Sequence, residues 1–229
     1  MVIKMKIIVY DTVNNTLETY YRDLWQYMPY SKNRWLSVKE FRGSSSSNIL
    51  WTTKQAIQAF NTTRQKWGKG IYVGYCFKRI WEGGHSRQSQ HYAGTAFDCA
   101  QNLSYSQRKE LYNLARKLNV WKYVEPISMT PTWLHFDRRY GTPACSAGYP
   151  SLSRGSRGVY VLILQDALST LGYSVGGLDG IFGQKTYNAV RKFQELTSLP
   201  TTGTCACLTW NALIDKVLAK GKTSTTILY

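Results

Sequence analysis

The amino-acid sequence predicts an α+β protein built from two domains, and three observations point to this class. Helical and strand-like patterns of apolar residues interleave in the first part of the chain, helical patterns alone occupy the last part, and a stretch rich in Gly, Pro and Ser separates them. With 229 residues, of which 43% are hydrophobic, the chain is long enough for two cores. We therefore expect a first domain at residues 1–150 with a small antiparallel sheet, a linker at 151–157, a domain of three helices at 158–220 and a flexible tail at 221–229.

The first domain is expected to open with a strand and continue with two helices. Apolar residues alternate with a period of two over residues 3–9, which is typical of a strand. Residues 17–28 carry Leu, Tyr and Met side chains at helical spacing, so a helix is expected there, although a Tyr-rich segment of this kind also suits an extended chain. Thr52 and Thr53 can cap a second helix, which Gly68 would end.

Three strands and one helix are expected in the rest of this domain. Residues 71–75 read as a buried strand. Ser104 and Gln107 have the spacing of a capping box, and the apolar residues that follow repeat at i, i+3, i+4 and i+7, which predicts a helix with one face in the core. Two further strand-like segments lie at 120–124 and 133–137.

The chain carries 29 Lys and Arg residues against 13 Asp and Glu, a formal net charge of +16. Such a charge favours a polyanionic partner: nucleic acid, an anionic membrane surface or a bacterial wall. Because the basic residues are scattered and form no block, nucleic acid is not the expected partner. No apolar run approaches the length of a membrane span, and the N-terminus lacks the continuous apolar core of a signal peptide, so we expect synthesis without an export signal.

Five cysteines give an odd count with no C-x-x-C pair, so the sequence implies neither a zinc ribbon nor a complete disulfide framework. They are Cys76, Cys99, Cys145, Cys205 and Cys207. We expect most of them to be buried as small apolar side chains, and none to bind a metal.

Two of the three histidines lie in short segments of small or apolar residues, where a solvated polar face would be poorly explained. His91 and Asp98 are seven positions apart, and His135 follows in a strand-like segment. Two histidines and one carboxylate make the ligand set of an open zinc site, which leaves a position for a water whose pKa the metal lowers. This arrangement is typical of hydrolases. The third histidine, His85, is expected to be exposed in a polar loop.

The string S-x-H-x-x-G-x-A-x-D at residues 89–98, followed by an apolar strand with a histidine, resembles the zinc D-alanyl-D-alanine peptidase family. This family includes peptidoglycan carboxypeptidases and endopeptidases of bacteria and phages, and it shares its metal-site fold with the hedgehog signalling domain. The resemblance implies that the first domain is a zinc peptidase domain with Zn²⁺ held by His91, Asp98 and His135.

The resemblance also suggests which residues bind the substrate. In the family, a basic residue ahead of the first histidine binds the carboxylate of the substrate or polarises its carbonyl. Arg79 is the first choice for this role and Lys78 the second, although the segment around them departs from the usual motif of the family. Ser89 is expected to shape the substrate site.

A zinc hydrolase also needs a general base. The family often places an acidic residue three positions before the last histidine, but this chain has Thr132 there. Two carboxylates remain as candidates. Asp137 shares a strand face with His135 and would serve either as base or as the group that orients His135. Glu125 ends the preceding strand, and it is the preferred candidate.

The last part of the chain resembles the bacterial peptidoglycan-binding domain, a three-helix module. The resemblance rests on the strings L-Q-D-A-L-S-T-L-G-Y, D-G-I-F-G-x-x-T, A-V-R-K-F-Q and T-W-N-A-L, between Ser156 and Val217. The Asp179-Gly180 and Thr202-Gly203 pairs are each followed by a threonine and an aromatic residue, which indicates a weak internal repeat. The implied partner is peptidoglycan.

Together these patterns predict a monomeric zinc metallopeptidase that acts on the stem peptides of peptidoglycan at the bacterial cell wall. Release of terminal D-alanine, as in a D-alanyl-D-alanine carboxypeptidase, is the first expectation. Cleavage of internal bonds by an endopeptidase, as in phage endolysins and autolysins, is the second. A wall-binding protein without catalytic activity is the third.

Overall fold

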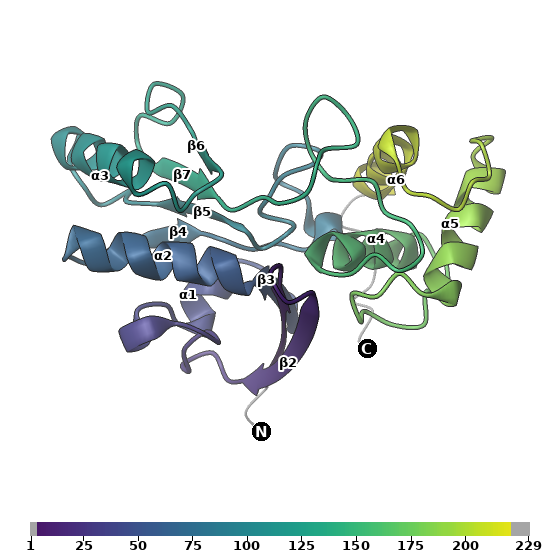
Figure 1. Ribbon diagram of the computed structural model, residues 1–229, viewed down its shortest axis with the longest axis horizontal. Coiled ribbons are helices and arrows are strands. Elements are labelled where there is room, and N and C mark those ends of the chain that lie inside the picture. Colours follow the sequence, from purple (N-terminus) through teal and green to yellow (C-terminus); the bar gives the residue numbers. More distant parts are fainter. Residues whose placement is uncertain (1–3, 221–229) are drawn as a thin grey trace.

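The computed structural model describes residues 4–220, which form two sheets and a C-terminal group of helices (Figure 1). The strands are β1 (Met5–Asp11), β2 (Thr16–Arg22), β3 (Ile49–Thr53), β4 (Val73–Tyr75), β5 (Ala96–Cys99), β6 (Tyr123–Val124) and β7 (Leu134–Asp137). The helices are α1 (Val38–Arg42), α2 (Lys54–Trp67), α3 (Tyr105–Leu118), α4 (Val159–Thr170), α5 (Gln184–Leu196) and α6 (Cys207–Lys220), with 3-10 turns η1 (Lys32–Arg34) and η2 (Ile80–Glu82).

The first sheet has the order β2-β1-β3, with β1 antiparallel to β2 and parallel to β3. The opening strand is confirmed, but the helix expected at residues 17–28 is wrong, because its first part forms β2. A tight turn explains the difference: the Asp11 carboxylate accepts a hydrogen bond from the Val13 amide at 3.0 Å, and Asn15 adopts a left-handed conformation. The chain therefore folds back onto β1, where Tyr and Thr side chains suit a strand.

The second sheet is antiparallel, with the order β4-β5-β7-β6, and its two faces differ sharply. Phe97 of β5 and Phe136 of β7 point into the core, where Phe97 stacks on Phe60 of α2 and Phe136 stacks on Trp121. Because side chains alternate along a strand, the polar residues of β5 and β7 lie on the opposite face. This sheet is the small antiparallel sheet that the sequence predicts.

Two other helices predicted in this part of the chain, α2 and α3, begin at the expected signals. The Thr53 hydroxyl accepts a hydrogen bond from the Ala56 amide at 3.1 Å to start α2, and Gly68 ends it in a left-handed conformation. Ser104 and Gln107 form a complete capping box at the start of α3.

The three C-terminal helices are also confirmed, and two glutamines give the internal repeat a structural basis. Gln165 of α4 accepts a hydrogen bond from the Gly180 amide at 3.0 Å and donates one to Thr186 at 3.1 Å. Gln194 of α5 accepts a bond from the Gly203 amide at 2.8 Å and donates one to Thr209 at 3.0 Å. In both cases the buried side-chain amide of a glutamine connects a glycine turn to a threonine of the next helix.

The two parts of the chain pack directly on each other. Arg79, which is 6% exposed, forms a forked ion pair with Asp166 of α4, one arm of which measures 2.7 Å. Tyr149 contacts both Tyr160 of α4 and Trp210 of α6. The predicted linker at residues 151–157 connects the two parts of the chain. Within it, Leu152 forms an antiparallel bridge with Cys205.

A disulfide joins Cys145 to Cys207, which are 62 positions apart in sequence and have Cα atoms 5.2 Å apart. The sequence implied no complete disulfide framework, and within residues 4–220 the structure has this single bridge. Residue spacing cannot reveal it, because only the packing of the loop before Pro150 against α6 brings the two sulfurs together. The other three cysteines are free and buried, as expected.

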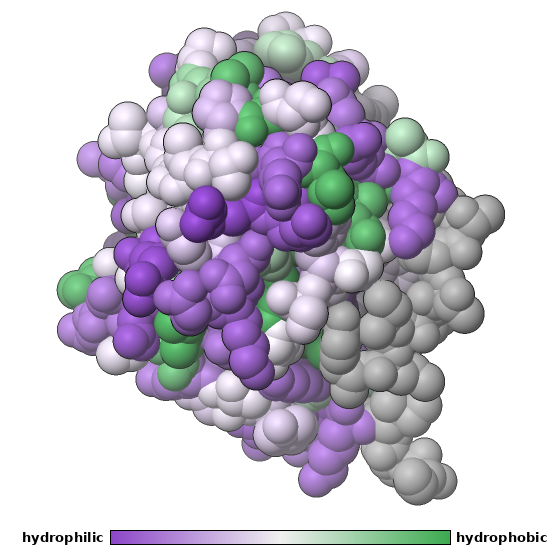
Figure 2. Space-filling model, turned by 90° about the vertical axis from the view of Figure 1, so that its right-hand side faces the viewer, coloured by the Kyte–Doolittle hydropathy of each residue, from purple (hydrophilic) through white to green (hydrophobic). Residues whose placement is uncertain are grey.

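Figure 1 shows α2 along one side of the four-stranded sheet, with α4, α5 and α6 forming the right-hand end of the molecule. Figure 2 looks onto that end, where hydrophilic residues predominate and hydrophobic residues form small separate areas of the visible surface. Within residues 4–220, no helix has both the length and the hydrophobicity needed to cross a bilayer. The tail predicted at 221–229 lies outside the described residues.

The buried ion pair between the two parts predicts a large stability effect. In Asp166→Ala, the Arg79 guanidinium would lose its counter-charge while remaining buried, and we expect the free energy of unfolding to fall by about 3–5 kcal/mol. Denaturant unfolding measures this loss. The control is Glu195→Ala, which removes the exposed ion pair with Lys192 and should cost less than about 1 kcal/mol. Equal, small losses in both variants would contradict the role of Arg79.

Candidate metal centre

The pairing of β5 with β7 places two of the predicted ligands side by side. In this antiparallel register Asp98 lies directly opposite His135, and both side chains project from the face that turns away from the core. The His135 Nδ1 atom is 2.8 Å from one oxygen of Asp98. The third ligand approaches from a loop: the His91 Nε2 atom is 3.3 Å from the other oxygen of Asp98.

The loop that carries His91 is held in place by β3 of the first sheet. The Trp51 indole donates a hydrogen bond to the Tyr92 carbonyl at 2.8 Å, and the Thr52 hydroxyl donates one to the Gly94 carbonyl at 2.7 Å. Gly94 has a φ of +64°, and a Cβ atom there would lie 1.9 Å from the Trp51 carbonyl oxygen. Only glycine fits this position, which explains the glycine between His91 and Asp98.

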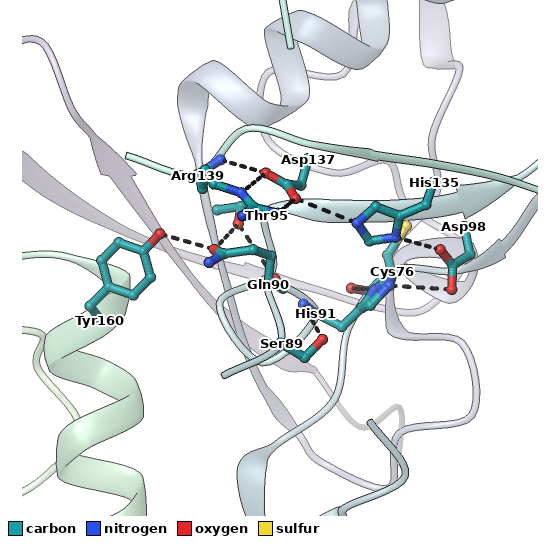
Figure 3. Close-up of polar contacts among 10 residues, drawn as sticks. All are labelled: Cys76, Ser89, Gln90, His91, Thr95, Asp98, His135, Asp137, Arg139 and Tyr160. Atoms are coloured by element: carbon teal, nitrogen blue, oxygen red, sulfur yellow. Dashed lines mark hydrogen bonds and ion pairs between the residues drawn. The ribbon is translucent and has the colours of Figure 1, made fainter. Parts of the chain in front are cut away.

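Each histidine is oriented by a group on its far side (Figure 3). The His91 Nδ1 atom lies 3.0 Å from the Cys76 carbonyl oxygen, which leaves Nε2 facing Asp98. The His135 Nε2 atom lies 3.4 Å from an oxygen of Asp137, which leaves Nδ1 facing Asp98. Carbonyl and carboxylate partners of this kind typically orient histidines that bind a metal.

The resulting cluster fits a zinc ion. One ligand atom from each of His91, Asp98 and His135 lies within 4.8 Å of the others. Two imidazole nitrogens and one carboxylate oxygen form a donor set that zinc prefers, and three protein ligands leave a position open for water or substrate. The sequence therefore identified a group of residues that could hold a metal.

Charge interactions inside the cluster alter its proton affinities. Burial opposes the charged form of His135, but hydrogen bonds with Asp137 and Asp98 outweigh it and raise the pKa of His135 to about 9. Burial would likewise raise the pKa of Asp98, yet hydrogen bonds with His135 and His91 hold it below the usual value of an aspartate. Both shifts favour a protonated His135 beside an ionised Asp98.

Asp137 lies behind His135 and is fully buried. Its carboxylate accepts hydrogen bonds from the Arg139 guanidinium, one of them at 2.7 Å, and from the Arg139 amide at 3.1 Å. Burial alone would raise the pKa of Asp137, but the hydrogen bonds from Arg139 and His135 have the larger combined effect and lower it. The carboxylate therefore stays charged. The orienting role that the sequence left open for Asp137 stays a prediction.

The cluster lies in a cleft of about 990 Å³. Glu125, at the end of β6, lines this cleft, and its amide is tied to the His135 carbonyl at 3.0 Å. Among the described residues, none forms a hydrogen bond or ion pair with the Glu125 carboxylate. Glu125 therefore differs from Asp137, whose two carboxylate oxygens accept hydrogen bonds from Arg139.

His85 is not exposed as expected. Its ring stacks on that of His91, with centroids 4.5 Å apart, and it lines the cleft. Burial and the neighbouring His91 lower the pKa of His85 to about 4. The polar sequence around His85 predicts an exposed loop. In the structure this loop folds back, and the Tyr92 hydroxyl contacts the His85 backbone.

The structure places the two basic candidates outside the cleft. Arg79 is directed to Asp166 and Ser47 rather than toward the candidate metal ligands, so the structure does not support the expected substrate role. Lys78 extends over the Tyr75 ring at 5.9 Å and does not line the cleft. Ser89 does line the cleft, and its hydroxyl accepts a hydrogen bond from the His91 amide at 3.2 Å.

Several residues of the cleft were missed by the sequence analysis. Arg139 and Tyr123 lie beside His135, with the guanidinium 4.7 Å from the Tyr123 ring centre. Arg139 follows Asp137 by two positions, a spacing that could have suggested a shared face. Cys145 and Asn211 also line the cleft, and no local pattern could have placed them there, because they lie far along the chain from the candidate metal ligands.

Comparison with known families assigns the C-terminal part of the chain. Residues 157–213 match the family described as "Putative peptidoglycan binding domain". Residues 157–213 form a peptidoglycan-binding domain. The metal cluster lies outside the matched residues.

Relatives of known sequence or structure match a similar share of the chain. A spore cortex-lytic enzyme of Bacillus cereus is 38% identical over 79 residues, which are 32% of this chain and 30% of that enzyme. A peptidoglycan-binding protein from Clostridioides difficile is 39% identical over 29% of this chain and 42% of its own, with a TM-score of 0.29. The SleB N-terminal domain is 37% identical over 29% of this chain and 92% of its own, with a TM-score of 0.29. The chain therefore spans less than a third of the cortex-lytic enzyme.

The cluster predicts a specific pattern of metal loss. His91→Ala, Asp98→Ala and His135→Ala should each lose stoichiometric zinc, because two remaining ligands do not hold an open site. His85→Ala is the matched histidine control and should retain zinc. Metal content after dialysis measures both results. Stoichiometric zinc in the three ligand variants would show that the cluster is not the site.

The raised pKa of His135 predicts that zinc binding depends on pH. Below about pH 9 the metal-free protein carries a proton on His135, which zinc must displace. The apparent zinc affinity should therefore rise as pH increases, by about tenfold per unit between about pH 6 and pH 8, with one proton released per zinc. Calorimetry in buffers of different ionisation enthalpy measures the proton, and an affinity independent of pH would contradict this prediction.

Proposed function

We propose that this chain is a zinc-dependent peptidase that cleaves peptides of bacterial peptidoglycan. The observation that carries the proposal is the cluster of His91, Asp98 and His135 in an open cleft, within a chain that also contains a peptidoglycan-binding domain. That domain associates the protein with the cell wall. The resemblance of residues 89–98 to the zinc D-alanyl-D-alanine peptidases supports the same function.

Bound zinc would polarise the carbonyl of the scissile peptide bond and lower the pKa of a water at its open position. Glu125 is the residue best placed to accept a proton. It lies on the cleft wall beside His135, and its carboxylate has no hydrogen bond or ion pair with any described residue. A carboxylate in this position can take a proton from the attacking water and pass it to the leaving amine.

Asp137 acts through His135 in this proposal. Its two oxygens are held by Arg139 and face the far nitrogen of His135, so it fixes the ring and keeps the ligating nitrogen turned toward Asp98. Arg139 in turn keeps the buried Asp137 ionised.

The arginines of the cleft bear on which bond is cut. A carboxypeptidase must bind a free terminal carboxylate, for which an unpaired arginine is the natural group. Arg79 is directed away from the cleft, Arg139 is paired with Asp137, and Arg87 at the rim is 2.8 Å from Asp215. The large open cleft also leaves room for a chain that continues past the scissile bond. We therefore favour endopeptidase cleavage, as in endolysins and autolysins, over the D-alanyl-D-alanine carboxypeptidase activity first expected.

Digestion of purified peptidoglycan tests this proposal. Zinc-loaded full-length protein should release fragments with new amino and carboxyl termini inside stem peptides or cross-bridges, as identified by mass spectrometry. Glu125→Gln should retain zinc but lower the rate about 100- to 10,000-fold, because the base is lost while the ligands remain. Glu110→Gln, which alters an exposed carboxylate on α3, is the control and should keep full activity.

Each alternative gives a different result. Free D-alanine from pentapeptide stems without internal cleavage would support the carboxypeptidase instead. Sedimentation with the wall and zinc binding without any cleavage would support a non-catalytic wall-binding protein. Undiminished turnover in Glu125→Gln would remove this residue from the role of base.

A further inference from the structure

The cleft has a second lining section, here called the second wall, which lies outside β5, β7 and the loop that carries His91. Residues 145–148 form one section of this wall, and Cys207 and Asn211 of α6 form the other. The family match includes Cys207 and Asn211, so the peptidoglycan-binding domain itself borders the metal cleft.

Residues 145–148 form the tip of a narrow loop with a paired base. Pro143 and Pro150 form an antiparallel bridge, and the Ala144 amide donates a hydrogen bond to the Tyr149 carbonyl at 2.8 Å. At the tip, Ser146 and Ala147 are exposed, and no described residue hydrogen-bonds their backbone groups. The backbone amide and carbonyl groups of these two cleft-lining residues are therefore available to a ligand.

Two links hold this wall in position. The Cys145–Cys207 disulfide ties the loop to the start of α6. Gln88, which comes from the loop that carries His91, accepts a hydrogen bond from the Tyr149 amide at 2.6 Å and donates one to Asn211 at 3.2 Å. Through Gln88, both sections of the second wall are connected to the loop that carries His91.

We propose that residues 145–148 and Asn211 form a subsite for the peptide that flanks the scissile bond, held in place by the disulfide. The ligand class is an extended peptide. Its backbone amides can pair with the free groups of the loop tip, as in strand addition to a sheet edge, while the scissile bond lies at the metal. The inference rests on the proposed function, because it assigns the substrate of the same cleft.

The preformed position of the wall explains how the disulfide would act. A loop that is already ordered does not need to be fixed when the peptide binds, so the entropic cost of binding is lower. Without the disulfide, the tip would keep its sequence and its amide groups but lose its fixed position. The effect should appear in peptide affinity rather than in metal content.

The experiment measures binding of a soluble pentapeptide stem to full-length, zinc-loaded protein carrying Glu125→Gln, so that the peptide is not consumed. Adding Cys145→Ser and Cys207→Ser together should raise the Kd about tenfold. Adding Asn211→Ala, which leaves the disulfide in place, should raise it about fivefold. Leu208→Ala is the matched control: this residue is 64% exposed on the same turn of α6, does not line the cleft, and should leave the Kd unchanged.

Zinc content and sedimentation with purified wall should stay the same in all variants, which shows that the metal site and the binding domain remain folded. An unchanged Kd in both Asn211→Ala and the double cysteine variant would overturn the subsite. The experiment distinguishes failure of the two proposals. If the protein cleaves peptidoglycan but the variants leave the Kd unchanged, the subsite is contradicted and the peptidase is not. A raised Kd in a chain without cleavage would support the subsite and contradict the peptidase.

Discussion

The antiparallel pairing of β5 with β7 is the constraint on which the site depends. Its register sets Asp98 opposite His135 and, one pair along on the other face, Phe97 opposite Phe136. A shift of one residue would exchange these faces, burying the charged groups and exposing the aromatic ones. The core contact of Phe97 with Phe60 therefore helps to fix the register that sets the candidate metal ligands in place.

A second constraint joins this sheet to the C-terminal helices. Tyr160 of α4 donates a hydrogen bond at 2.9 Å to Gln90, the residue before His91, and Gln90 also accepts one from Thr95 (Figure 3). The ion pair of Arg79 with Asp166 lies at the same interface. Binding to peptidoglycan through the C-terminal domain would therefore occur next to the cleft, and under the proposed function this short distance would raise the local concentration of substrate.

The sequence predicted the parts that depend on local pattern. The capping box at Ser104, the strand-like pattern of residues 133–137 and the spacing of His91 from Asp98 are each visible within a few residues. The orientation of Arg79 could not be predicted in this way, because its partner Asp166 lies 87 positions away and only the folded chain brings them together. The Cys145–Cys207 bridge and the second wall of the cleft depend on the same long-range packing. The strand β2 was missed because its pairing with β1 outweighs a weak helical pattern.

The most direct test of the account is the metal dependence of cleavage on purified peptidoglycan. Full-length protein is stripped of metal with a chelator, dialysed, and assayed for new amino groups before and after addition of one equivalent of zinc. The account predicts that cleavage is absent from the stripped protein and returns with zinc, while sedimentation with the wall is the same in both states. Equal cleavage with and without zinc would contradict it.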